Sequence, residues 1–252
     1  MEKKISVVIN TYNAEEHLAE CLEAVKDFDE IVVCDMESTD RTVEIAQQYG
    51  CRVVTFPKGE HKSAEPARTF AIQSAQNPWV LVVDSDEIIT PELRQYLYQR
   101  IEEQDCPAGL YIARHNKTFG RFSRDWSHDY QLRFFVREGT VWPPYVHTFP
   151  QVPGRTERIP TRYKMLHLAD EDVRNWVRKM NEYTDNEVDK KAARGFGVMA
   201  LFFRPLWAFI RSFFFKGGFR DGRRGVIQSL QSAMYQQVLI SKIIEKKIRA
   251  ER

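Results

Sequence analysis

The chain has 252 residues, and its balance of 43% hydrophobic and 29% charged residues is ordinary for a globular protein. The formal net charge of only +2 argues against a nucleic-acid partner, and the absence of an apolar run of about eighteen residues argues against a membrane span. The four cysteines lack metal-site spacing and the N-terminus lacks a signal-peptide pattern, so a reducing cytosol is the expected location.

The N-terminal segment, 1–104, alternates short apolar runs with amphipathic stretches. Buried strands are predicted at four places: 5–9, 31–34, 52–56 and 79–83. Helices are predicted after each strand: from Asn13 as a cap, after Ser38-Thr39-Asp40, over 65–76, and from Thr90-Pro91. This order predicts an α/β fold with a mostly parallel sheet, helices on both faces, and ligands beyond the carboxyl ends of the strands.

The pattern changes after residue 104. Short strand-like runs are expected at 110–113, 131–136 and 162–166. Helical patterns then dominate, over 171–193, 197–215 and 226–248. We therefore expect an α/β domain over 1–165 and a helical subdomain over 166–252.

The sharpest chemical feature is Asp84-Ser85-Asp86, which closes the fourth predicted strand and precedes Glu87. Two carboxylates at this spacing can hold Mg²⁺ or Mn²⁺, whose coordination is then completed by water and by phosphate oxygens of a substrate. The alternative is a solvated acidic turn in which Asp86 caps a helix. The position at a strand end favours the metal site.

Two further groups follow the first and second strands. Asp35 could accept hydrogen bonds from a base or ribose, although Asp35 and Asp40 could also only cap the next helix. Thr11 and Tyr12 could line a nucleotide pocket, whereas Asn13 is best explained as a helix cap.

These segments carry a resemblance. The stretches 5–15 and 31–46, the helix that contains Arg68, and 82–87 together resemble family 2 glycosyltransferases of the GT-A fold. Within that family, 130–134, Val146-His147, His167 and 204–222 are similar to the bacterial lipopolysaccharide-core β-1,4-glucosyltransferases.

The resemblance implies inverting transfer of a hexose, with glucose from UDP-glucose as the family's suggestion, to lipopolysaccharide core or another cell-envelope glycan or glycolipid. Segment 1–104 would bind the nucleotide sugar and 105–165 would face the acceptor. The implied roles are base contact for Asp35, the nucleotide pocket for Thr11 and Tyr12, the diphosphate or uridine for Arg68, the ribose or sugar for Asp84, and the divalent cation for Asp86 with Asp84.

The sequence departs from the family pattern at two places. Met36-Glu37 replaces the usual small residue or Gly after the second-strand acid, and Thr148 replaces a Glu that is a plausible general base. The base must come from the acceptor side, where the candidates are Asp129, Glu138 and His147, with Asp129 and His147 favoured equally. Asp129 could instead pair with Arg133, and His147 could be an ordinary loop histidine.

Segment 196–219 is rich in Phe and is interrupted by Arg204-Pro205 and Arg211. An interfacial helix on the inner face of the cytoplasmic membrane fits this pattern better than a span, because centrally placed arginines are costly in a bilayer. Residues 194–224 also carry seven basic residues against the single acid Asp221. The alternative is a helix packed under the catalytic domain.

Three other protein classes compete with this interpretation. A haloacid-dehalogenase-type phosphatase also uses two aspartates after a strand, but it carries them on its first strand. An NAD-dependent dehydrogenase is disfavoured because no GxGxxG follows the first strand. A catalytically inactive scaffold member of the family stays open because of Thr148.

Overall fold

A computed structural model describes residues 3–61, 63–122, 129–145, 148–170, 172–192 and 195–251. The chain divides into two compact units. The first unit comprises Met1–Asn116 and Ser127–Ala169, and the second comprises Lys117–Trp126 and Asp170–Arg252. The described residues 117–122 therefore belong to the unit that contains the C-terminal helices, which the sequence did not indicate.

The first unit alternates strands and helices and then adds further strands. Its elements are β1 (Ile5–Thr11), α1 (Glu15–Val25), β2 (Glu30–Asp35), α2 (Thr42–Gln48), β3 (Arg52–Thr55), α3 (Glu65–Ser74), β4 (Trp79–Asp84), β5 (Glu87–Ile89), α4 (Pro91–Glu102), β6 (Gly109–Thr118), β8 (Asp129–Val136), β9 (Thr156–Arg158) and β10 (Lys164–His167). The last two residues of β6 reach into the second unit.

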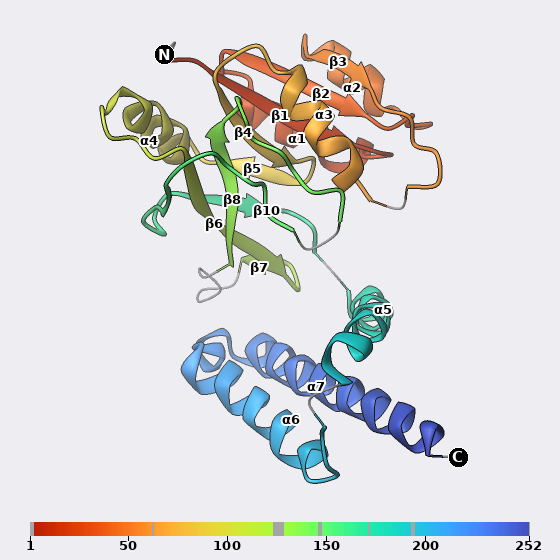
Figure 1. Ribbon diagram of the computed structural model, residues 1–252. Helices are drawn as coiled ribbons and strands as arrows, with labels where there is room; N and C mark the ends of the chain where they lie inside the picture. The colour runs from red at the N-terminus through yellow and green to blue at the C-terminus, as the bar shows by residue number, and fades with distance from the viewer. Residues whose placement is uncertain are drawn as a thin grey trace. The chain divides into compact units, whose positions relative to one another are not determined.

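The strands form one sheet in the order β3-β2-β1-β4-β8-β6-β10-β5 (Figure 1). The first four strands are parallel, as the alternating pattern predicts. Beyond β4 the sheet is mixed rather than mostly parallel, because β8 pairs antiparallel with both β4 and β6, and β5 pairs antiparallel with β10. The α/β expectation is confirmed, and the mixed half supplies side chains from both strand directions to one region.

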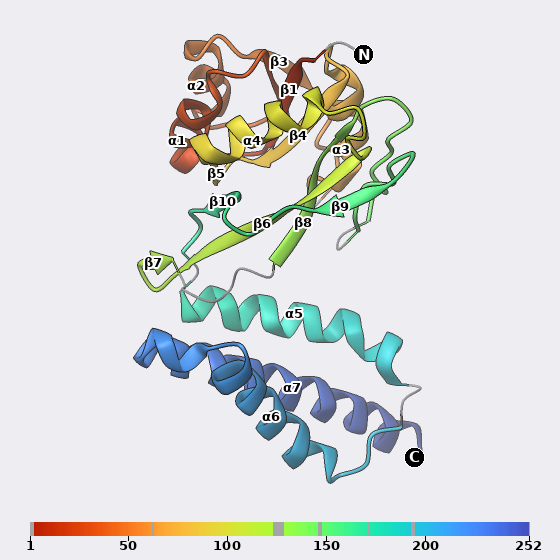
Figure 2. The ribbon, with the colours of Figure 1, turned by 90° about the vertical axis from the view of Figure 1, so that its left-hand side faces the viewer.

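Helices cover both faces of the sheet, as predicted. Ile5, Val7 and Ile9 share one core with α1 and α4, whereas Val8 faces the other core with α3. The two cores follow from the alternation of side chains along a strand. Figure 2 shows α1 and α2 on one side of the strands and α3 on the other.

The capping predictions had mixed outcomes. Thr90 caps α4, since its hydroxyl accepts the Leu93 N–H at 3.3 Å. The prediction for Asn13 is wrong: α1 begins after Ala14, and Asn13 has a left-handed φ of 48°. Its side-chain oxygen accepts the Thr39 N–H at 2.8 Å instead, so Asn13 ties the loop after β1 to the loop after β2.

The second unit is helical from α5 onward, as expected. It contains the two-residue strand β7 (Arg121–Phe122), α5 (Val173–Ala192), α6 (Ala200–Ile210), the π-helical turn η1 (Arg211–Phe215), the 3₁₀ turn η2 (Gly218–Asp221) and α7 (Arg223–Ala250). Among the described residues, no helix combines the length and apolarity that crossing a bilayer requires.

Candidate active site

Polar side chains gather where the parallel strands end. Thr11, the last residue of β1, lies opposite Asp35, the last residue of β2. On the other side of β1, Asn10 lies opposite Asp84, the last residue of β4. The three predicted positions Thr11, Asp35 and Asp84 therefore meet at one edge of the sheet, which is where α/β sheets bind their ligands.

Asp35 is buried, and its carboxylate is held from two directions. The Thr11 hydroxyl donates to it at 2.9 Å, and the Ser38 N–H and hydroxyl donate at 2.8 and 2.6 Å. Because α2 starts only at Thr42, Asp35 closes the loop after β2 and does not cap that helix. Asp40 accepts the N–H of Thr42 at 3.0 Å, but the cap position of α2 is Arg41, so the prediction that Asp40 caps this helix is wrong.

Tyr12 lies beside this loop with about half of its surface exposed (48%). The Lys58 ammonium lies 4.8 Å from the centre of its ring, and the Lys58 N–H donates to the Glu37 carboxylate at 3.0 Å. Glu37 has a φ of 61°, a left-handed conformation that favours glycine. The Met36-Glu37 departure therefore keeps the turn and replaces glycine by a residue whose side chain anchors the next loop.

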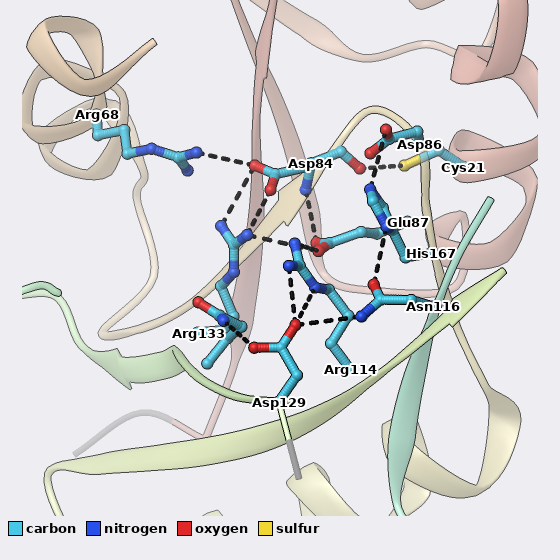
Figure 3. A network of polar contacts seen from close by, with 11 residues as sticks. Cys21, Arg68, Asp84, Asp86, Glu87, Arg114, Asn116, Asp129, Arg133 and His167 are labelled. Atoms are coloured by element: carbon cyan, nitrogen blue, oxygen red, sulfur yellow. Dashed lines mark hydrogen bonds and ion pairs between the residues drawn. The ribbon is translucent and has the colours of Figure 1, made fainter. Parts of the chain in front are cut away.

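Asp84 is paired with two arginines (Figure 3). Arg68 from α3 donates to its carboxylate at 3.0 Å, and Arg133 from β8 donates at 3.3 Å through Nη1 and more closely through Nη2. Burial raises the pKa of Asp84, but Arg133 and Arg68 outweigh it and hold the pKa well below its usual range. Asp84 is thus a fixed carboxylate whose charge is already balanced.

Glu87 faces the interior and is fully buried. One carboxylate oxygen accepts the Asp84 N–H at 2.9 Å, and the other lies 3.4 Å from Arg133 and 3.6 Å from Arg114. Burial raises the pKa of Glu87, and the two arginines only partly offset this. Glu87 therefore links Arg133, which holds Asp84, to Arg114. Its carboxylate is buried, whereas that of Asp86 is partly exposed.

Asp129, a predicted base, lies at the start of β8. Arg114 donates to one of its oxygens at 2.9 Å, Asn116 reaches the same oxygen at 3.3 Å, and Gln131 donates to the other at 2.7 Å. The alternative partner expected from sequence, Arg133, is occupied with the Asp84 group. Burial raises the pKa of Asp129, but Arg114 and the two amides bring it below its usual value.

Asp86 faces His167, the last residue of β10. The His167 Nε2 lies 3.2 Å from an Asp86 oxygen, and both side chains are partly exposed. The His167 Nδ1 lies 2.9 Å from Asn116 Oδ1. Figure 3 shows this pair at the side of the cluster away from Arg68. Among the residues that the structure describes, no three His, Cys, Asp or Glu side chains group as metal ligands.

Of the other two base candidates, only Glu138 is among the described residues. Glu138 lies in the turn after β8, where the Arg137 N–H bonds the Pro78 carbonyl at 2.8 Å. It is therefore at the opposite end of β4 from Asp84, roughly 20 Å along the strand, and the prediction that it serves as base is wrong. His147 lies outside the described residues. Thr148 donates to the Tyr145 carbonyl at 2.7 Å and so closes its own loop.

The sequence prediction missed four members of the cluster as site residues: Arg114, Asn116, Arg133 and His167. A signal existed for each of them, since His167 belongs to the motif resemblance and the other three follow strand alternation. Arg114 and Asn116 stand two residues apart on β6, and Arg133 lies four residues after Asp129 on β8, so polar residues alternate on one face of each strand. What the sequence could not give was the pairing that brings β6, β8 and β10 together beside β4.

Three comparisons with known proteins bear on this site. A family model described as Glycosyl transferase family 2 matches residues 6–221. The Lipopolysaccharide core biosynthesis glycosyltransferase LpsC of Rhizobium meliloti is 25% identical over 260 residues, which cover 96% of this chain and 92% of LpsC. The Poly(ribitol-phosphate) beta-glucosyltransferase of Bacillus spizizenii is 34% identical over 118 residues, which cover 42% of this chain and 19% of that protein.

The fold has a counterpart among solved structures. The structure of S. aureus TarS 1-349 in complex with UDP aligns with a TM-score of 0.54, covering 91% of this chain and 90% of that chain at 15% identity. At this identity the likeness shows the fold, and it confirms the predicted GT-A architecture with added C-terminal helices.

Proposed function

The chain belongs to glycosyl transferase family 2, and from this premise we propose that it moves a hexose from a UDP-sugar to a cell-envelope glycan or glycolipid. Inverting transfer with a bound Mg²⁺ or Mn²⁺ is part of this proposal. The similarity to a lipopolysaccharide-core glycosyltransferase supports lipopolysaccharide core as the acceptor, and the resemblance of the sequence motifs suggests glucose or a related hexose as the sugar.

One observation carries the metal part of the proposal. Asn116 donates its amide to Asp129, which directs its carbonyl oxygen toward His167 Nδ1. A neutral His167 that donates from Nδ1 then turns the lone pair of Nε2 toward the Asp86 carboxylate, 3.2 Å away. Two acceptors at this distance need a proton or a cation between them, and an imidazole with a carboxylate is a suitable ligand pair for a divalent ion.

The remaining residues support donor binding. Asp35, fixed by Thr11, is the proposed partner of the nucleobase, and Tyr12 offers an exposed ring at the pocket edge. Arg68 is the proposed contact of the diphosphate, since its Nε and Nη1 have no hydrogen-bond partner among the described residues. Asp84, held by both arginines, is the proposed acceptor of hydrogen bonds from the ribose or the sugar.

These groups suit an inverting displacement. Asp86 and His167 would hold the cation, which when bound offsets the negative charge of a leaving diphosphate. Asp129 would orient His167 through Asn116, since its lowered pKa and its full set of donors suit a fixed carboxylate better than a proton acceptor. His147 stays the proposed general base on the evidence of sequence.

The family assignment removes the phosphatase alternative, in which Asp84 would act as nucleophile; pairing with two arginines also weakens that carboxylate as a nucleophile. The inactive-scaffold alternative makes a different prediction. A scaffold would retain the fold and the partners but would turn over no nucleotide sugar.

A thermal-shift and turnover panel tests the proposal. UDP with Mn²⁺ should raise the melting temperature more than either alone, and one of a set of UDP- and other nucleoside-diphosphate sugars should be hydrolysed. Asp86→Ala should lose both responses, whereas Asp105→Ala, at an exposed acid after α4, should keep them. No stabilisation by UDP and Mn²⁺ together with no turnover of any donor would favour the scaffold.

The proposed working place is the inner face of the cytoplasmic membrane. None of the residues in α6 is buried, although the helix is apolar and aromatic. Phe202 and Trp207 on α6 and Phe215 in the following turn are 66%, 57% and 73% exposed. An exposed apolar face of this kind marks an interaction surface. The neighbouring basic residues favour contact with an anionic lipid surface over contact with a second apolar protein.

Vesicle flotation tests this location. The full chain should float with vesicles that contain phosphatidylglycerol and stay behind with pure phosphatidylcholine. Replacing Phe214 and Phe215 by Ser should abolish flotation, whereas Ile248→Ser, at an equally exposed apolar residue of α7, should not. Equal flotation of the two variants would contradict lipid contact through the Phe residues, and dimerisation without flotation would identify a second copy as the cover.

A further inference from the structure

Trp142 lies in the segment after β8, and only 7% of its surface is exposed. The proposed function gives it no role. Its backbone is clasped to α3: the Trp142 N–H donates to the Thr69 hydroxyl at 2.9 Å, and that hydroxyl donates to the Trp142 carbonyl at 2.9 Å. One helical turn further on, Gln73 donates to the Thr140 carbonyl at 3.1 Å. The indole is therefore fixed against the helix that carries Arg68.

The indole ring serves both arginines that hold Asp84. The guanidinium carbon of Arg68 lies 4.5 Å from the ring centre, and that of Arg133 lies 5.8 Å from it. Arg68 comes from α3 and Arg133 from β8, and the two reach Asp84 from different sides (Figure 3). One indole ring thus contacts two cations that belong to different elements of the fold.

The hydrogen bonds alone do not fix the Arg68 guanidinium, whereas that of Arg133 is already held by Asp84 and Glu87. Arg68 bonds Asp84 through Nη2 only, and its Nε and Nη1 have no hydrogen-bond partner among the described residues; the same is true of Arg133 Nε. A buried cation with unmet donors is costly unless another interaction stabilises it. An aromatic face within about 6 Å supplies such an interaction, and supplies it in a defined direction.

We infer that Trp142 is a positioning residue, which through Arg68 and Arg133 fixes the orientation of the Asp84 carboxylate before the donor binds. This inference rests on the proposed function, because Asp84 is the first acid of the proposed donor site. Loss of the ring leaves Arg68 with one hydrogen bond and no fixed direction. Asp84 keeps its two bonds to Arg133 but loses its hold on Arg68, so the carboxylate shifts from the orientation that transfer needs. Small misplacements of this kind lower the rate of the chemical step more than they weaken binding.

A merely structural Trp142 is the alternative, because its ring also packs against the core of Phe135 and Leu132. The two roles differ in what can replace the indole. Core packing accepts a large aliphatic side chain, whereas the proposed role needs an aromatic face. The indole Nε1 has no hydrogen-bond partner among the described residues. Phenylalanine at position 142 therefore retains an aromatic face and loses no hydrogen bond.

The experiment compares Trp142→Phe and Trp142→Leu in the full chain, with Trp79→Leu as the matched control. Trp79 is equally buried but stacks on Phe134 at the other end of β4, 5.2 Å between ring centres. We expect Trp142→Phe to keep kcat within about threefold and Trp142→Leu to lower it at least tenfold with a much smaller change in KM. Trp79→Leu should lower the melting temperature and leave kcat of the folded enzyme unchanged.

A second readout does not depend on turnover. The ring current of Trp142 should displace the NMR signal of the Arg68 Nε–H upfield, an assignment made with Arg68→Lys. Trp142→Leu should abolish that displacement, and Trp142→Phe should retain part of it. If the wild type turns over no nucleotide sugar, the proposed function fails. The NMR comparison still shows whether Trp142 holds Arg68 over its ring.

Two results would overturn the inference. One is an Arg68 signal that is the same in Trp142→Leu and in the wild type. The other is a kcat for Trp142→Leu that equals that of Trp79→Leu once both are corrected for the folded fraction.

Discussion

His167 Nε2 lies 3.2 Å from a carboxylate oxygen of Asp86, and the two residues come from the ends of different parts of the sheet. Asp86 follows β4, and His167 ends β10, eighty-one positions later in the chain. The antiparallel pairing of β10 with β5 sets His167 opposite Glu87, next to Asp86. One residue of this pair therefore follows a strand of the parallel half of the sheet, and the other ends a strand of the mixed half.

Removing either member of this pair should weaken binding of the proposed cation. Asp86→Ala and His167→Ala should each abolish sugar transfer, because one remaining ligand cannot hold the cation in place. Binding of Mn²⁺ in the presence of UDP, followed by electron paramagnetic resonance, should weaken at least about tenfold in both variants. Circular dichroism should be unchanged. Full transfer by Asp86→Ala would refute the proposed metal role.

Asn116 should matter for metal binding without touching the metal. Its carbonyl oxygen faces His167 Nδ1 at 2.9 Å and so selects the tautomer with a free Nε2. Asn116→Leu should lower Mn²⁺ affinity by about 10–100-fold, the usual effect of losing a partner behind a ligand. Nitrogen-15 NMR of the imidazole should report a mixture of tautomers. Gln99→Leu, at an exposed position of α4, is the control.

A pH series should reveal the ion pair of Asp129. Its pKa is lower in the folded protein than the value of about 3.9 expected of an unfolded chain. Between the two pKa values, the folded state therefore binds fewer protons than the unfolded state. The ion pair of Asp129 contributes its full stabilisation above the unfolded pKa, and this stabilisation is lost as pH falls through the folded pKa. Urea unfolding between pH 3 and pH 7 should show this loss in the wild type and lack it in Asp129→Asn.

The two base candidates should separate kinetically. His147→Gln should lower kcat by about 10²–10⁴-fold at saturating metal, the range expected for a lost general base. Asp129→Asn should act mainly on metal affinity, so raising the Mn²⁺ concentration should recover much of its activity. If Asp129→Asn stays inactive at high Mn²⁺ and His147→Gln is active, the base is Asp129 and its low pKa rises when substrate binds.

The parallel half of the fold was predictable because its signals are local. Runs such as 5–9 and 79–83 are apolar on both faces, and Thr90-Pro91 marks a helix start within two residues. The acids that close these strands were predictable for the same reason, since parallel order alone brings their carboxyl ends together.

The mixed half was less predictable because pairing there depends on long-range contacts. Strand β6 has neighbours in both directions, β8 antiparallel and β10 parallel, and nothing in its own sequence specifies which strands those are. The charged residues Arg114 and Arg133 read as solvent-facing in isolation. They are buried or half-buried because acids from β4 and β5 meet them there.

Asn13 shows a different limit of prediction from sequence. Its side chain was expected to accept a backbone hydrogen bond, but the sequence did not identify the N–H that donates it. An asparagine before a helix usually caps that helix, yet here its oxygen bonds the Thr39 N–H of the neighbouring loop. The Asn13 N–H in turn donates to the Ser38 hydroxyl at 2.8 Å, and Ser38 bonds Asp35. Asn13 therefore holds the loop that carries Tyr12 against the loop that carries Asp35.

Substitution of Asn13 should separate its bond from its backbone conformation. Asn13→Gly loses the bond to Thr39 but relieves the left-handed φ of 48°, whereas Asn13→Ala loses the bond and keeps the strain. Asn13→Ala should lower the free energy of unfolding by about 1–2 kcal/mol, and Asn13→Gly by about 1 kcal/mol less. Both should weaken UDP binding to the same extent, because both release the Thr39 N–H. Equal stability of the two variants in urea would contradict the backbone strain at Asn13, and UDP binding equal to the wild type would show that the tie between the loops does not shape the nucleotide pocket.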